Sequence, residues 1–363
     1  MIGFIFAWWW LLLVESLIVA GIIGVLALNA HRLVGDTPKG LAALKASMAI
    51  TAVVTFIGYI GLLVGVGRLL SAYTGSQASA EMLVWGATIV SILLIGVQWL
   101  FSPYLINVFY RTRPPQSRDE LLLQEELRRI AELSGVKTPK LRIADLSMPN
   151  AFAYGSPLAG SYVAVTRGLL RSMPLEEVRA VLGHEVGHLK HRDVSWLLAL
   201  SLVPLAIYFI GRALIWSGFL GGGSRERGSP LVLVAIGAAL VAASILFRFL
   251  VAHFNRLREY YADAHGAMVS GGPRYMQRAL ARLDYMYRSN PALVEEAKSN
   301  ETAAMLFIVA PLVELSGGFL YDIDSYVDRL KRVEPSPLEE LFSTHPPIPK
   351  RIRFLDRLAL YRE

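Results

Sequence analysis

Five long apolar runs dominate this sequence and limit the kind of protein that it can form. Each run is long enough to cross a bilayer as a helix, which takes roughly 20 residues. The runs lie at about residues 2–30, 46–66, 82–109, 194–219 and 230–253. Because 54% of the residues are hydrophobic and only 18% are charged, the composition also argues against an ordinary soluble protein. We therefore expect a mainly helical integral membrane protein with about five transmembrane helices.

Charges in the connecting segments predict how these helices are oriented. The segment after the third run opens with "RTRPPQSR", and residues 31–45 carry the basic side chains His31, Arg32, Lys39 and Lys45. Since basic residues favour the cytoplasmic side, we expect both segments to face the cytoplasm in a protein of the cell membrane. These basic segments also explain the net charge of +7, so the lipid bilayer, and not nucleic acid, is the expected partner.

The polar residues form two segments that we expect to fold together as one domain. They contain 84 residues (110–193) and 110 residues (254–363), which suffices for a globular domain. Residues 1–109 then form three N-terminal transmembrane helices, and residues 194–253 form a transmembrane hairpin within the domain. Helices are predicted at 119–134, 174–192 and 275–288, a strand at "PKLRIADL", and a β-hairpin at "NAFAYGSPLAGSYVAVT". The expected fold class of the polar domain is α+β.

The stretch "GHEVGHLKH" at residues 183–191 places three histidines and a glutamate on one predicted helix. His184 and His188 are four residues apart, so their imidazoles can share one tetrahedral zinc ion. Glu185 follows the first histidine and is placed to accept a proton from a water molecule that the metal activates. Apolar residues occupy the opposite side of this helix. Because the chain has no cysteine, its zinc ligands must be nitrogen and oxygen atoms.

The candidate third ligand follows the membrane hairpin, in "NRLREYYADAHGA". Glu259 and Asp263 are four residues apart and share a helix face. Glu259 is the candidate ligand, and Asp263 is the candidate acceptor for the other ring nitrogen of a histidine ligand. Taken alone, this stretch fits a solvated helix whose acids pair with neighbouring arginines, but the upstream motif favours the metal site. His191 is then not needed as a ligand, and we interpret it as an interfacial histidine or a support for the ligands.

Several ordered motifs give the chain a resemblance to a known family. "MPNAFAYG", "VAVTRGLL", "GHEVGHLKHRD", "NRLREYYADAHGA" and "FSTHPPIPKRIRFL" resemble the HtpX membrane zinc metalloproteases, relatives of the CAAX prenyl proteases. The resemblance covers roughly residues 110–355. It implies a zincin-like (gluzincin) domain in the cytoplasm that cleaves misfolded or damaged membrane proteins. It also implies one zinc ion held by His184, His188 and Glu259, with Glu185 as the catalytic base. The chain departs from the family in its extra N-terminal span and its longer segment at 289–335.

Other candidate residues lie outside the zinc motifs. His345 precedes two prolines, which hold it in a fixed extended loop, so it is a candidate donor to the oxyanion of the reaction. A surface loop histidine is an equally good interpretation, and Arg351 is a weaker donor candidate. Asn150 opens a segment that fits an edge strand pairing with substrate backbone. Glu15, in the first apolar run, is expected to pair with a polar group such as Arg212 or to lie near water.

Two other functions remain open from the sequence. The first is a CAAX-type protease that acts on prenylated tails, which the small number of apolar runs disfavours. The second is a non-enzymatic membrane scaffold with a vestigial metal site. An intramembrane protease is disfavoured, because the helix that carries the histidines also carries five charged side chains at Glu176, Glu177, Arg179, Lys190 and Arg192.

Overall fold

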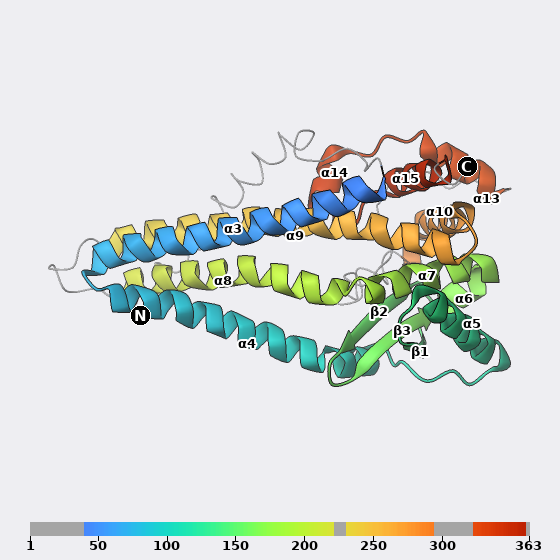
Figure 1. The fold of residues 1–363 in the computed structure, drawn as a ribbon, viewed down its shortest axis with the longest axis horizontal. Helices are drawn as coiled ribbons and strands as arrows, with labels where there is room; N and C mark the ends of the chain where they lie inside the picture. The colour runs from blue at the N-terminus through green and yellow to red at the C-terminus, as the bar shows by residue number, and fades with distance from the viewer. Residues whose placement is uncertain (1–39, 221–229, 294–321, 361–363) are drawn as a thin grey trace. The chain divides into compact units, whose positions relative to one another are not determined.

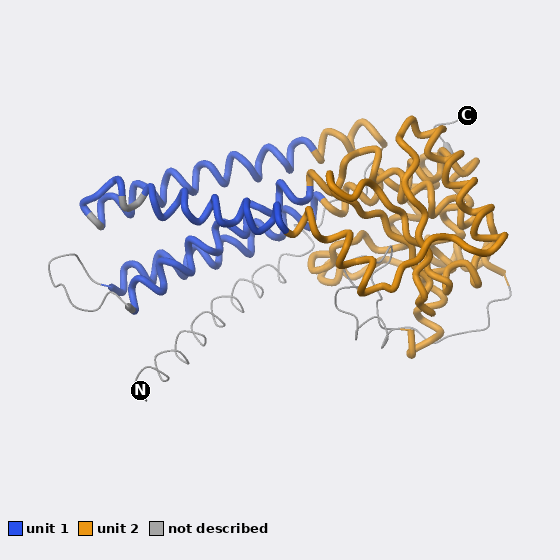
Figure 2. The backbone as a smooth tube through the Cα atoms, turned by 90° about the horizontal axis from the view of Figure 1, so that it is seen from below, with its two compact units in different colours: residues 1–35, 49–97, 197–254 blue, residues 36–48, 98–196, 255–363 orange. Residues whose placement is uncertain are grey.

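The computed structural model describes residues 40–220, 230–293 and 322–360 of the chain (Figure 1). The first apolar run with Glu15, the turn at 221–229 and most of the longer segment at 289–335 lie outside the described residues. The chain divides into two compact units (Figure 2). One unit comprises residues 1–35, 49–97 and 197–254, and the other comprises residues 36–48, 98–196 and 255–363.

Four helices of the described part are long and apolar enough to cross a membrane. They are α3 (Leu41–Thr74), α4 (Gln77–Phe109), α8 (Asp193–Leu220) and α9 (Pro230–Val269). They correspond to the second to fifth apolar runs, so the prediction of membrane-spanning helices is confirmed for these four. Helix α9 has 40 residues and is about 60 Å long, whereas a bilayer with its headgroups is about 40–45 Å thick. Its last turns therefore extend beyond the membrane.

In the first unit these helices pack closely through small and polar residues. A Cβ atom at Gly211 of α8 would lie 2.8 Å from the carbonyl oxygen of Gly237 of α9, so neither position accepts a larger residue. Such close backbone approach is typical of helices that associate within membranes. The Tyr59 hydroxyl of α3 also hydrogen-bonds with the Thr88 hydroxyl of α4 at 3.1 Å.

The second unit contains a three-stranded sheet surrounded by helices. The strands β1 (Lys140–Ala144), β2 (Ala151–Ser156) and β3 (Gly160–Thr166) lie in the order β1-β3-β2. Strand β1 is parallel to β3, and β2 pairs with β3 in the predicted antiparallel hairpin. The helices that lie wholly within the described part of this unit are α5 (Arg118–Ser134), α6 (Arg167–Ser172), α7 (Leu175–Lys190), α10 (Pro273–Ser289), α13 (Ile323–Lys331), α14 (Pro337–Phe342) and α15 (Ile348–Leu360).

The core of this unit combines residues from before and after the membrane hairpin. Val181 of α7 packs in one apolar cluster with Leu127 of α5, Ile143 of β1, Leu280 of α10 and Ile352 of α15. The three helices predicted at 119–134, 174–192 and 275–288 are confirmed as α5, α7 and α10. The unit is of the α+β class that the sequence predicts, and its described residues come from both sides of the membrane hairpin.

Candidate metal centre

Two helices approach each other closely because glycines line their contact. Gly183 and Gly187 lie on α7, and Gly266 lies on α9. A Cβ atom added to Gly266 would lie 2.7 Å from the carbonyl oxygen of Ala180, which leaves no room for a side chain. This approach brings the histidine face of α7 against the acidic face of α9. The whole of α7 from Val178 to His188 is buried except at Arg179, so its histidine face is not open to solvent as the sequence pattern suggested.

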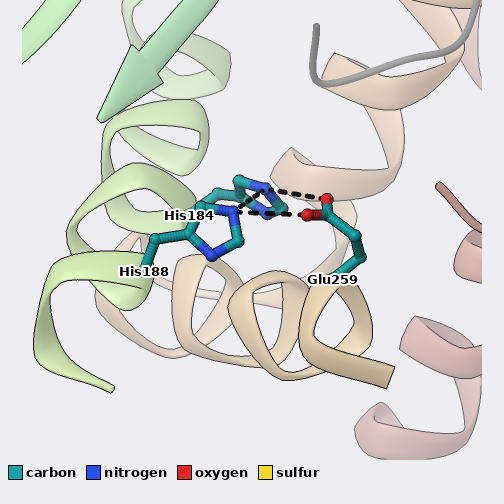
Figure 3. Close-up of side chains that lie close together, drawn as sticks. All are labelled: His184, His188 and Glu259. Carbon is teal, nitrogen blue, oxygen red and sulfur yellow. Dashed lines mark hydrogen bonds and ion pairs between the residues drawn. The ribbon is translucent and has the colours of Figure 1, made fainter. Parts of the chain in front are cut away.

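Three side chains converge at this contact (Figure 3). His184 Nε2 lies 3.1 Å from His188 Nε2. Glu259 Oε2 lies 3.4 Å from His184 Nε2, and Glu259 Oε1 lies 3.6 Å from His188 Nε2. All three side chains are buried, and one donor atom from each lies within 4.8 Å of the others. The structure thus brings together the three residues that the sequence nominates as ligands.

A carboxylate orients each of the two imidazole rings. Asp263 Oδ1 lies 2.9 Å from His184 Nδ1, and Asp193 Oδ2 lies 2.8 Å from His188 Nδ1. A carboxylate next to Nδ1 holds the ring proton on that atom, so the lone pair of the ring is on Nε2. Both Nε2 lone pairs then point toward each other and toward the Glu259 carboxylate.

This arrangement fits a bound metal ion. Two lone pairs and a negative charge would repel one another in a buried site without a cation between them. Glu259 Oε2 also accepts no hydrogen bond from the described residues, although it is buried. Two imidazole nitrogens and one carboxylate are donors that transition-metal ions favour. His184, His188 and Glu259 would hold the ion.

Arginines hold the carboxylates of the site in place. Arg351 is fully buried and donates two hydrogen bonds to Asp263, at 2.7 and 2.6 Å. Arg258 donates to Glu259 Oε1 at 2.9 Å and lies 3.8 Å from Asp193. The position of Arg351 therefore favours a role in orienting the Asp263 carboxylate over a role as a hydrogen-bond donor to substrate.

Glu185 lies between the metal site and the edge of the sheet. Its carboxylate oxygen Oε2 accepts a hydrogen bond of 2.6 Å from the backbone N–H of Ala153 on β2. Burial raises the pKa of Glu185 to about 7, because an apolar environment disfavours the charged form. A carboxyl group with this pKa can both take up and release a proton near neutral pH.

His345 is buried beside the metal site. It is 9% exposed, and its Nδ1 lies 3.3 Å from Glu259 Oε2. Side chains of α9 fix its loop, since Asn255 donates to the Thr344 carbonyl oxygen at 2.7 Å and Arg256 donates to that of Ser343 at 2.9 Å. The interpretation of His345 as a surface loop histidine is therefore wrong.

Asn150 and His191 lie near the site but outside the group of donors. Asn150 directly precedes β2 and is 4% exposed, and its backbone carbonyl oxygen accepts hydrogen bonds from Thr166. His191 ends α7, and its ring lies 4.1 Å from that of Tyr261 and 5.8 Å from that of His265, between centroids. A role for Asn150 in substrate binding stays a prediction.

Sequence reasoning missed Asp193, Arg258 and the Ala153 N–H group. Asp193 follows His188 by five residues, which no regular helix would place beside that ring. The regular helix is interrupted between α7 and α8 at Arg192, whose φ of +54° is a left-handed conformation that few residues other than glycine adopt. The acidic residue directly after "HLKHR" was the only available signal.

A buried glutamate beside two histidines, with a buried carboxylate from a second helix, is the residue pattern of a metalloprotease site. The family model of peptidase family M48 matches residues 117–359. The chain belongs to this family and is a membrane metalloprotease. Membership of this family favours an enzyme over the non-enzymatic membrane scaffold that the sequence left open.

The chain is similar to proteins described as HtpX proteases. It is 57% identical over 313 residues to a "Protease HtpX homolog" of Aeropyrum pernix, covering 86% of this chain and 97% of that protein. It is 39% identical to one of Thermoplasma acidophilum, covering 79% and 90% respectively. A solved structure, that of S. mikatae Ste24p, aligns with 86% of this chain and 67% of its own at 15% identity and a TM-score of 0.49. The HtpX-type resemblance of the motifs is confirmed.

Proposed function

We propose that this protein is a zinc endopeptidase that cleaves misfolded or damaged membrane proteins. The observation that carries the proposal is the convergence of His184, His188 and Glu259 beside Glu185 and the edge strand β2. Two imidazoles and a carboxylate, with a position left open, are a ligand set of catalytic zinc. The peptidase domain comprises residues 110–193 and 254–363, interrupted by the hairpin at 194–253.

The residues of the site divide the work of peptide hydrolysis among them. Zinc, when bound, acts as a Lewis acid toward a water molecule and the scissile carbonyl group. Glu185 accepts the proton of the attacking water and passes it to the leaving amine. His345 donates to the oxyanion that develops on the carbonyl oxygen. Asp263 and Asp193 keep the ring protons of the two histidines on Nδ1, away from the reaction.

The substrate class follows from the position of β2. This strand is at the edge of the sheet in the described part of the chain, and Ala153, which contacts Glu185, lies on it. An edge strand binds an extended peptide through main-chain hydrogen bonds and needs little side-chain specificity. Such binding suits unfolded segments of many proteins. The basic loops at 31–45 and from residue 110 support a cytoplasmic domain at the cell membrane.

The test compares the full-length protein with Glu185→Gln and Glu259→Ala in detergent or vesicles. We expect Glu185→Gln to keep zinc, measured by mass spectrometry, and to lose cleavage of an unfolded membrane protein. Glu259→Ala should lose zinc. Cleavage by Glu185→Gln at the wild-type rate would sink the mechanism. A prenylated peptide serves as a second substrate, and faster cleavage of this peptide would indicate the CAAX-type activity instead.

A further inference from the structure

The β2–β3 hairpin contacts the membrane-spanning helix α4 near the C-terminal end of that helix. The Ser156 hydroxyl, at the tip of the hairpin, donates to the carbonyl oxygen of Leu100 on α4 at 3.2 Å. The Tyr154 hydroxyl, two residues back along β2, donates to Asn107 Oδ1 at 2.6 Å. Both contacts lie within the second unit, where Figure 1 shows the hairpin beside the end of α4. The hairpin therefore runs along the helix toward the membrane.

The length of α4 places Leu100 within the bilayer. Its apolar span, Glu81–Phe109, has 29 residues and is about 43 Å long, which matches a bilayer with its headgroups. Leu100 lies nine residues before the end of this span, or about 13 Å along the helix. One headgroup layer is only about 5–8 Å thick. The Ser156 side chain thus reaches the level at which the acyl chains begin.

The backbone of α4 is irregular beside this contact. Pro103 within the helix has no N–H group, so the carbonyl oxygen of Trp99 loses its usual partner. The Ser102 hydroxyl donates to that oxygen at 3.2 Å. The hairpin supplies the Ser156 hydroxyl to the next carbonyl oxygen, that of Leu100. Polar side chains commonly satisfy backbone groups near a proline in this way within membranes.

The tip itself has the side chains of a membrane-contacting turn. Its loop is short, and Gly160 at φ +81° allows the tight reversal into β3. Leu158 is 64% exposed at the tip, and the neighbouring end of α4 exposes Phe101, Tyr104, Leu105, Val108 and Phe109. An exposed leucine alone means little, but this one lies two residues from Ser156, which contacts a helix with many exposed apolar side chains.

Basic and aromatic side chains follow at the depth expected for lipid headgroups. Tyr162 lies two residues beyond Gly160, which is about 7 Å along the strand. Lys140 Nζ lies 5.3 Å from the centroid of its ring and the Arg142 guanidinium 5.4 Å from it. Tyrosine and basic residues are enriched at membrane interfaces, where the cations attract anionic headgroups.

We propose that the tip of the β2–β3 hairpin, residues 156–160, lies in the bilayer surface, with Leu158 among the lipid acyl chains. Strand β2 then ends at the membrane, and its earlier residues lie progressively farther from it. Ala153, whose N–H group contacts Glu185, lies three residues from Ser156, or about 10 Å along the strand. On the proposed function, a substrate paired with β2 is therefore cut within a few residues of its exit from the membrane.

The absence of cysteine in the chain permits a direct test with single labels. Nitroxide is attached to Leu158→Cys and, as a matched control, to Leu175→Cys, in zinc-loaded protein reconstituted in phosphatidylcholine–phosphatidylglycerol vesicles. Leu175 is also an exposed leucine, at 44%, but it begins α7 and lies at the opposite end of that helix from the span α8. Collisions with oxygen and with a water-soluble nickel complex are measured by electron paramagnetic resonance.

We expect the label at residue 158 to favour oxygen over nickel by several-fold and the label at residue 175 to show the reverse. Equal nickel accessibility at the two positions would overturn the inference. Pro157→Cys, at the exposed neighbouring position, gives a second label if Leu158→Cys loses its zinc. This readout does not depend on proteolysis, so it decides the inference even if the proposed function fails.

A second measurement addresses the consequence for substrates. Leu158→Asp places a charge in the tip and should slow cleavage of a membrane-anchored substrate several-fold, while cleavage of the same segment as a free peptide stays unchanged. If Leu158→Asp cleaves the membrane-anchored substrate as fast as the wild type does, the tip has no part in substrate capture. A wild-type protein that cleaves neither substrate would count against the proposed function, not against the position of the tip.

Discussion

Each histidine of the metal site has its own carboxylate partner, and the two partners are supported differently. Asp263 accepts two hydrogen bonds from the buried Arg351. Asp193 lies beside His188 and, at 3.8 Å, beside Arg258. Such partners fix ring orientation and increase the basicity of the ligand nitrogen. Asp193 is therefore a positioning residue whose removal should weaken the metal site without removing a ligand.

The substitution Asp193→Asn tests this role. It keeps the shape of the side chain but removes its charge, so we expect zinc affinity to fall about 10–100-fold. The affinity is measured by competition with a chromophoric chelator. Asp145→Asn is the control, since Asp145 pairs with Arg167 at the surface and its side chain is 60% exposed. An affinity of Asp193→Asn equal to that of the control would contradict the role of Asp193.

A second residue-scale prediction concerns Glu120, which lies far in sequence from the residues of the metal site. Hydrogen bonds from Arg113, together with those from the backbone N–H groups of Gln116 and Ser117, lower the pKa of Glu120 to about 2 against the effect of burial. A carboxyl group with a lowered pKa stabilises the fold above its ordinary pKa. This stabilisation should be lost as the pH falls from about 5 toward about 2.

The matched substitutions Glu120→Gln and Glu125→Gln test this pH dependence. At pH 7 we expect Glu120→Gln to reduce the free energy of unfolding by about 2 kcal/mol, and the difference from wild type should shrink below about pH 4. Glu125 pairs with Arg128 at the surface, with its side chain 62% exposed, so its loss should have little effect. Thermal unfolding across this pH range measures both. A constant difference at all pH values would contradict the prediction.

The site could be predicted where its residues follow local rules. The spacing of His184 and His188 and that of Glu259 and Asp263 each follow from one helical turn, and the structure brings all four together. Asp193 could not be predicted in this way, because its contact depends on a left-handed residue between two helices. The hydrogen bond from Ala153 to Glu185 joins a strand and a helix, and no local pattern encodes it.

At the scale of elements, the site depends on how closely α7 and α9 pack. A Cβ atom at Gly266 would lie 2.7 Å from the carbonyl oxygen of Ala180 and 3.0 Å from the backbone nitrogen of His184. These are backbone atoms that cannot move aside singly. Any larger residue must therefore push the two helices apart, and with them the histidines from Glu259.

We expect Gly266→Ala to reduce stability by roughly 1–3 kcal/mol and to weaken zinc binding in the same protein. Thermal unfolding and chelator competition measure the two effects. Gly65→Ala in α3 is the control, because a Cβ atom there would meet no atom within 4 Å and alanine favours the helix. Unchanged zinc affinity in Gly266→Ala would show that the close contact of α7 and α9 is not needed for the site.

Elements were predictable when one periodicity extends over their whole length. The apolar runs predict α3, α4 and α8 with ends that differ by up to eight residues, and alternation predicts the β2–β3 hairpin. The length of α9 was not predicted, since its apolar run ends near residue 253 and the helix continues to Val269 with a polar sequence. Burial of α7 was also missed, because helix–helix contacts from distant segments cover its histidine face.

At the scale of the whole molecule, the residues of the metal site come from both sides of a membrane hairpin in the sequence. His184 and His188 precede α8, whereas Glu259 follows it on α9. The core of the same unit is divided likewise, since Val181 comes before the hairpin and Leu280 after it. Within the first unit, Gly211 and Gly237 hold the two helices of the hairpin in close contact. Each half of the chain therefore needs the other to complete the metal site and the core. The shared core and the contact at Gly211 and Gly237 both favour association of the two halves.

A chain split between Gly223 and Ser224, outside the described residues, tests this dependence. We expect neither fragment alone to bind zinc with wild-type affinity, because the first lacks Glu259 and the second lacks both histidines. Co-expression should restore zinc binding, since the Gly211–Gly237 contact and the shared core bring the fragments together in the membrane. Gly237→Leu in the second fragment should prevent this recovery, because Gly237 has no room for a side chain. Full zinc affinity in the first fragment alone would show that Glu259 is not required.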